Sequence, residues 1–132
     1  MAILTKDQIL NADDLKTETV FVEQWGGEVI LRTMKAYERD RFEDSMFKGR
    51  GKNRHENMEN LRARFLALII IDDKGKSLFT SSQDVRDLGN KSAAALDFLF
   101  DKGRKLNGMS DQDVEDLTTD LDDAQGEDSL SD

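Results

Sequence analysis

Residues 22–32 read VEQWGGEVILR, and this stretch determines the main β element of the fold. Strand-forming residues flank the pair Gly26-Gly27. A two-residue glycine loop is typical of a β-hairpin, because the favoured turns need positive φ angles. With that loop, Val22 is expected to oppose Leu31. The sequence therefore predicts a hairpin over about 17–25 and 28–33.

The two faces of this hairpin differ in their predicted roles. One face is aliphatic and consists of Val20, Val22, Val29 and Leu31. The other face carries Phe21, Trp25 and Ile30 and is also apolar. A two-stranded ribbon is marginally stable alone, so one face must pack on the rest of the domain. For the second face two interpretations stay open. Either it is buried within the monomer with Trp25 capping the core, or it joins copies of the chain or receives a partner helix.

Length and composition favour a single domain without a membrane span. The chain has 132 residues, of which 37% are hydrophobic and 36% are charged. It has no cysteine, which excludes disulfides, thiolate zinc sites and thiol nucleophiles. No apolar run approaches the roughly 18 residues that span a bilayer, and the N-terminus lacks a signal-peptide pattern. The chain is expected to be soluble and intracellular.

The negative charge is concentrated at the C-terminal end. The net charge is −9, yet residues 110–132 contain acidic side chains and neither Lys nor Arg. Such blocks are usually solvated. We therefore expect a body over 1–109 and an acidic tail over 110–132, with a short helix to about 121 and disorder beyond. The tail is interpreted as solubilising; binding of a basic partner or use as a junction to a further segment stays open.

Helical patterns fill most of the body. Thr5 and Gln8 form a capping box that begins a helix over about 5–11. Apolar spacing predicts three longer helices, over 34–47, 55–70 and 91–106, and a short helix that begins at a capping box over 80–83 and stops at Gly89. The basic stretch 48–54 is read as a flexible loop. The fold class is thus α+β: a mostly helical single domain with an N-terminal β-hairpin and a disordered acidic C-terminal tail.

Motifs for catalysis, metals and cofactors are incomplete in this sequence. Gly75-Lys-Ser77 resembles the end of a phosphate-binding loop, but Ile70 stands where that loop needs glycine. The acidic residues after Ser110 echo a calcium loop, but Asp116 occupies its glycine position. His55 is the only histidine. We expect no enzyme, no catalytic residues, no metal and no cofactor. Nucleic acid is not expected either, because the basic loop has no aromatic residue for stacking.

The order of the segments resembles the tail assembly chaperones of long-tailed, siphovirus-type bacteriophages. The matching pieces are ILNADDLKTETVFVEQWGGEVILR, then YERDRFED, then NLRARFLALIIIDDKGKSLFTSSQDVRDLGNKSAAALDFLFDKGRKLNGMS, about two thirds of the chain. The most specific part runs from Leu78 to Phe100. The basic stretch 48–54 departs from the pattern.

The resemblance implies a function in virion assembly. Such chaperones bind the tape measure protein, keep its long hydrophobic helices soluble and promote polymerisation of the tail tube around it. It further implies a location in the host cytoplasm and absence from the mature virion. Independently of the resemblance, the apolar hairpin face and the open strand edge favour a homo-oligomer. In many relatives a ribosomal frameshift makes a longer form that recruits the tail tube protein. The alternative is a structural or adaptor subunit retained in the phage particle.

Overall fold

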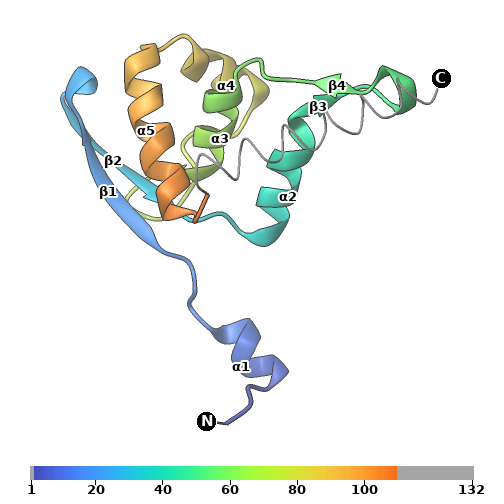
Figure 1. Cartoon of the computed structure of the whole chain (residues 1–132). Helices are drawn as coiled ribbons and strands as arrows, with labels where there is room; N and C mark the ends of the chain where they lie inside the picture. Colours follow the sequence, from blue (N-terminus) through green and yellow to red (C-terminus); the bar gives the residue numbers. More distant parts are fainter. Residues whose placement is uncertain (1, 110–132) are drawn as a thin grey trace.

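A three-stranded sheet and a group of helices make up the body of the protein (Figure 1). The computed structural model describes residues 2–109, so the predicted tail helix and tail disorder lie outside the described residues. Within residues 2–109 the class is α+β, as predicted, with α5 (Ala93–Leu106) lying along the N-terminal hairpin. The helices thus cover one face of the sheet and leave its other face uncovered in Figure 1.

The hairpin forms, but its register differs from the prediction. Strand β1 (Thr17–Val22) pairs antiparallel with β2 (Gly27–Arg32), and Val22 faces Gly27 instead of Leu31, a shift of four residues. The turn is longer than two residues, because η1 (Glu23–Trp25) forms a 3-10 helix before Gly26. Gly26 closes it with φ +67°, a left-handed conformation that favours glycine.

The shift leaves the predicted faces of the two strands unchanged. Side chains alternate with period two, so an even shift returns each residue to its own face. The aliphatic face packs on the helices as expected: Val20, Val22 and Leu31 are buried, and the half-buried Val29 lies against the core. The hairpin is therefore anchored through this face.

A third strand comes from a segment that the sequence left ambiguous. Helix α3 (Leu61–Ile69) ends directly before β5 (Ile70–Ile71), which pairs antiparallel with β2. Leu31 lies opposite Ile70 on the inner face, and both side chains are buried. The β-branched pair thus leaves the helix and joins the sheet. The strand order β1-β2-β5 leaves β1 as an edge strand.

Helix α3 is the centre of the core. Six of its nine residues are buried, so it is apolar on nearly every side: Leu61, Ala63, Phe65, Leu66, Ala67 and Ile69. It packs against α5 and against α4 (Ser82–Gly89). The Phe65 ring lies between two other aromatic rings, with centroid distances of 5.2 Å to Phe42 and 5.1 Å to Phe100. The inner face of the hairpin closes this core.

Three predictions, two about helices and one about the basic stretch 48–54, were wrong. Helix α3 begins at Leu61, not near 55, because β4 (His55–Glu56) pairs with β3 (Phe47–Lys48) in a small second hairpin. The basic stretch between these strands contains the 3-10 turn η2 (Gly51–Asn53) instead of an irregular loop. Helix α2 (Ala36–Ser45) buries Phe42, whereas Tyr37, which the apolar spacing places on the same stripe, is exposed.

Capping explains where the remaining helices begin. Helix α1 (Lys6–Asn11) has the predicted capping box between Thr5 and Gln8. The box of α4 joins Ser81 and Asp84, one residue later than predicted, because the Asp84 carboxylate accepts bonds from the Thr80 and Ser81 amides. Helix α5 begins at Ala93 and is capped by Ser92, whereas the predicted start at 91 would place the cap at Asn90. These differences move helix ends without changing the architecture.

Candidate protein-binding surface

The outer face of the hairpin presents two of the three residues predicted to bind a partner. Phe21 on β1 is 59% exposed, and Ile30 on β2 is half-buried on the same face. Ile30 lies opposite Thr19 on one side and Ile71 on the other, so this face is continuous across three strands. The structure thus places Phe21 and Ile30 on one face of the sheet, which we call the outer hairpin face; Phe21 is exposed there, whereas Ile30 is half-buried and Ile71 is buried.

The third predicted residue, Trp25, lies elsewhere. Because the chain enters η1 after Val22, Trp25 leaves the strand alternation and packs against the core. It lines a hollow of about 270 Å³ with Phe79, Asp87, Leu88 and Lys91. The expected grouping of Trp25 with Phe21 and Ile30 is therefore wrong in its geometry. We call this hollow the Trp25 groove.

The chemistry of the Trp25 groove suits an aliphatic side chain. It is lined by the apolar side chains of Trp25, Phe79 and Leu88 and by the exposed, oppositely charged Asp87 and Lys91. The volume is below the roughly 300–1,000 Å³ usual for small-molecule sites. A small, mainly apolar lining with two opposite charges fits an inserted side chain from a protein partner better than a cofactor.

The N-terminal segment carries apolar side chains that the sequence analysis did not identify as exposed. Residues 2–16, here called the N-terminal arm, extend away from the body beyond the end of the hairpin (Figure 1). None of the residues of α1 is buried. The large apolar side chains of the arm are Ile3, Leu4, Ile9, Leu10 and Leu15, and all five are exposed. The sequence shows these apolar residues around the capping box. Their exposure depends on how the body of the protein folds and could not be read from the sequence.

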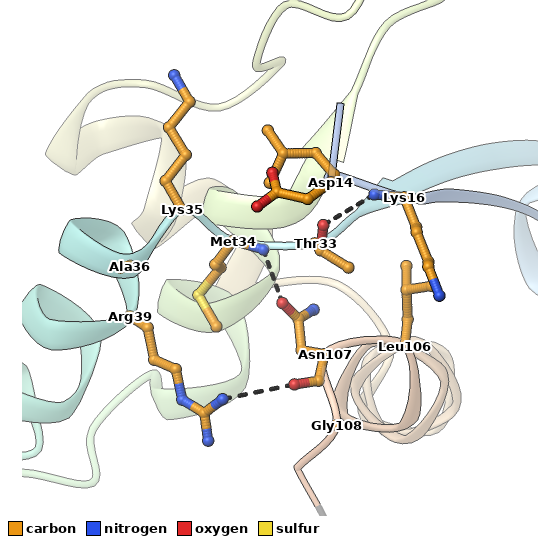
Figure 2. A pocket seen from close by; sticks show the side chains of 11 residues that line it. Asp14, Lys16, Thr33, Met34, Lys35, Ala36, Arg39, Leu106, Asn107 and Gly108 are labelled. Carbon is orange, nitrogen blue, oxygen red and sulfur yellow. Dashed lines mark hydrogen bonds between the residues drawn. The ribbon is translucent and has the colours of Figure 1, made fainter. Parts of the chain in front are cut away.

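A second, more polar hollow lies where the arm joins the body. Figure 2 shows its lining from the arm, the connection between β2 and α2, and the end of α5, around a volume of about 530 Å³. The Asn107 side chain crosses this junction: its Oδ1 accepts from the Met34 amide at 2.7 Å, and its Nδ2 donates to the Gly103 carbonyl at 2.9 Å. Arg39 donates to the Asn107 carbonyl at 3.5 Å. These bonds join α5 to the segment between β2 and α2.

An ion pair borders the outer hairpin face on the side of the arm. Arg32 on β2 donates to both carboxylate oxygens of Glu38 on α2, at 2.8 and 2.6 Å. The hydrogen bond with Arg32 lowers the pKa of Glu38 below its ordinary range, and the same bond raises the pKa of Arg32. Both side chains are largely buried, so this pair holds the first turn of α2 against the sheet.

Residues 2–109 show neither a group of metal ligands nor a membrane-spanning helix. In residues 2–109 no group of three or more His, Cys, Asp and Glu side chains could hold a metal ion. His55, on β4, bonds through Nδ1 with the Asn53 carbonyl at 2.8 Å. None of the helices in this part of the chain is long and apolar enough to cross a bilayer. The surfaces of residues 2–109 that are suited to binding are formed by exposed apolar side chains.

The comparisons with known proteins give a structural relative. No protein-family model matches the sequence, and no curated protein matches it. Among solved structures, the "Structure of bacteriophage HK97 tail assembly chaperone" matches with a TM-score of 0.53 and 14% sequence identity. The match covers 80% of this chain and 95% of the HK97 chain. It shows that the two chains share a fold, and this fold agrees with the family resemblance of the sequence.

Proposed function

We propose that this protein is a phage tail assembly chaperone that binds the tape measure protein, keeps it soluble and promotes polymerisation of the tail tube around it. The observation that carries the proposal is the shared fold with the HK97 tail assembly chaperone over nearly the whole of that chain. The ordered sequence segments that resemble the same family support it independently.

The outer hairpin face is the proposed contact with the tape measure protein. A long hydrophobic helix needs apolar surface to cover it, and the outer hairpin face offers the exposed Phe21 together with the half-buried Ile30. Exposed apolar patches on soluble proteins commonly mark association sites. The unpaired edge of β1 lies beside this face and offers backbone groups for a further strand.

The experiment is co-expression of this chain with the tape measure protein of the same phage. Wild type is expected to move the tape measure protein into the soluble fraction and to co-purify with it. Phe21→Asp places a charge on the outer hairpin face and should reduce co-purification at least tenfold while circular dichroism stays unchanged. Phe98→Asp is the matched control, since Phe98 is also an exposed aromatic residue but lies on α5.

Two results would contradict the proposal. One is a tape measure protein that stays insoluble with wild type. The other is equal loss of co-purification in the Phe21 and Phe98 variants, which would indicate a general charge effect rather than a defined surface.

The proposal includes self-association of the chain, location in the host cytoplasm and absence from the mature virion. The alternative is a structural or adaptor subunit that stays in the particle. Mass spectrometry of purified virions separates the two, because a chaperone is missing from them and an adaptor is present in stoichiometric amount. In this proposal, a longer, frameshifted form of the protein recruits the tail tube protein.

A further inference from the structure

The apolar side chains of the N-terminal arm are exposed. Ile3 is 94% exposed, Leu10 is 70% exposed and Ile9 is 57% exposed. Five of the large exposed apolar side chains of residues 2–109 lie in this short segment. Single exposed apolar residues are common on protein surfaces, but a group of them on one short arm indicates a contact surface.

A covering partner would add to the stability of the short helix in the arm. Helix α1 has six residues, and isolated helices shorter than about 12–15 residues are marginal in water. Its capping box between Thr5 and Gln8 supports the first turn but buries no apolar surface. Most helical stability in proteins comes from packing of an apolar face, so α1 is suited to order fully on a second surface.

The connection to the hairpin directs the arm away from its own Trp25 groove. The Lys16 amide donates to the Thr33 hydroxyl at 3.0 Å, and the Thr33 amide donates to the Lys16 carbonyl at 2.9 Å. These bonds extend the hairpin by one pair and fix the point at which the arm leaves. The groove lies at the opposite end, at the turn that follows β1.

The distance along the hairpin favours a contact between molecules. Strand β1 has six residues and spans roughly 20 Å at about 3.3 Å per residue. The linker 12–16 reaches at most about 17 Å when fully extended. Figure 1 shows α1 beyond one end of the hairpin and the turn at its other end. A second copy can present its groove to the arm without this constraint.

The arm and the groove are complementary in chemistry. The lining of the groove is mainly apolar and includes the oppositely charged Asp87 and Lys91. Helix α1 carries Ile9 and Leu10 shortly after a Lys6-Asp7 pair of opposite charges. Lys6 and Asp7 carry charges opposite to those of Asp87 and Lys91, so an arm bound in the groove can form ion pairs with them.

We propose that the N-terminal arm of one copy binds the Trp25 groove of a second copy, with Leu10 inserted between Phe79 and Leu88. This inference rests on the proposed self-association and assigns an interface to it. The two surfaces are different parts of the chain, so the contact is heterologous and leaves one arm and one groove free in each pair.

The test is sedimentation velocity of the full chain over a range of concentrations. Leu10→Asp removes the arm contact and Phe79→Asp blocks the groove, and each is expected to weaken association at least tenfold. An equimolar mixture of the two variants should form a heterodimer that grows no further, because it contains one intact arm and one intact groove. Tyr37→Asp on α2 is the control for adding a charge at an exposed apolar site and should associate as wild type.

Trp25 gives a second readout, because it is the single tryptophan of the chain. Its emission should shift to the blue as wild type associates and should stay constant with concentration in Leu10→Asp. If Phe79→Asp fails to fold, charge reversal decides: Asp87→Lys should weaken association, and adding Lys6→Asp should restore it.

The inference is overturned if wild type is monomeric at every concentration, or if Leu10→Asp associates as wild type. Self-association that survives in all these variants refutes the arm–groove contact and leaves the proposed chaperone function intact. Loss of tape measure binding in a chain that keeps the arm–groove contact would contradict the proposed chaperone function and leave the arm–groove contact intact.

Discussion

Replacing Gly103 with alanine is expected to destabilise the protein, although the substitution improves helix propensity. Gly103 is a buried residue of α5 at the contact with α3. A Cβ atom at this position would lie 2.4 Å from Ile69 Cδ1 and 2.8 Å from Phe65 Cε1. Both neighbours are fully buried, so the added methyl group has no free space to enter.

Two opposing terms set the magnitude. In a helix interior, alanine is favoured over glycine by about 0.8–1 kcal/mol. Overpacking a close-packed core usually costs about 1–3 kcal/mol. The upper part of that range applies, because the Phe65 ring is held between Phe42 and Phe100 and cannot turn away. The net loss should be about 1–2 kcal/mol in the free energy of unfolding.

Urea denaturation followed by circular dichroism measures this loss. Gly89→Ala is the matched control: the added Cβ would lie 2.5 Å from Asn60 Oδ1, but that side chain is exposed and can rotate. Its unfolding free energy should stay within about 0.5 kcal/mol of wild type. A Gly103→Ala variant as stable as wild type, or more stable, would refute the close approach of α3 and α5.

Three further predictions concern the sheet and its junctions. Trp25→Ala should lower the unfolding free energy by about 1.5–3 kcal/mol, less than the roughly 3–5 kcal/mol typical of an enclosed site, because the groove beside it is open; an unchanged denaturation midpoint would show that the indole does not pack on the core. Glu38→Gln should remove a stabilisation that is present above the ordinary glutamate pKa of about 4.3 and is lost as pH falls through the lowered pKa of the folded state. Thermal melts between pH 7 and pH 2.5 should therefore converge for wild type and Glu38→Gln at the acid end, and a constant difference would contradict the assigned role of Arg32. Asn107→Ala should cost about 1–2 kcal/mol by leaving the Met34 amide without its acceptor, as measured by chemical denaturation.

Local patterns in the sequence determine many of the elements. The capping box at Thr5 and Gln8 depends on residues three positions apart, and it forms where predicted. The apolar spacing over 91–106 predicted α5 within two residues at its start. The alternation in the hairpin predicted which aliphatic side chains are buried, and that prediction survived a wrong register because the error was an even number of residues.

The candidate site was predicted only in part, because strand alternation says nothing about where a strand ends. Phe21 and Ile30 lie on the predicted face, since they stay within paired strands. Trp25 does not, because the chain turns into η1 and the indole packs against the core, where it lines a hollow with Phe79 and Leu88 from distant parts of the sequence. The glycine pair alone therefore did not predict the length of the turn, which includes the three residues of η1.

The sequence by itself thus determined the fold class, the anchoring face of the hairpin and the positions of most helices, because these follow from interactions between near neighbours in the chain. Tertiary structure alone decided that Ile70–Ile71 joins the sheet, that α3 is enclosed on nearly all sides and that the apolar residues of the N-terminal arm are uncovered. Pairing and burial are properties of two segments at once. The sequence shows which residues are apolar and would therefore gain free energy from burial. Only the folded structure shows which of them are buried.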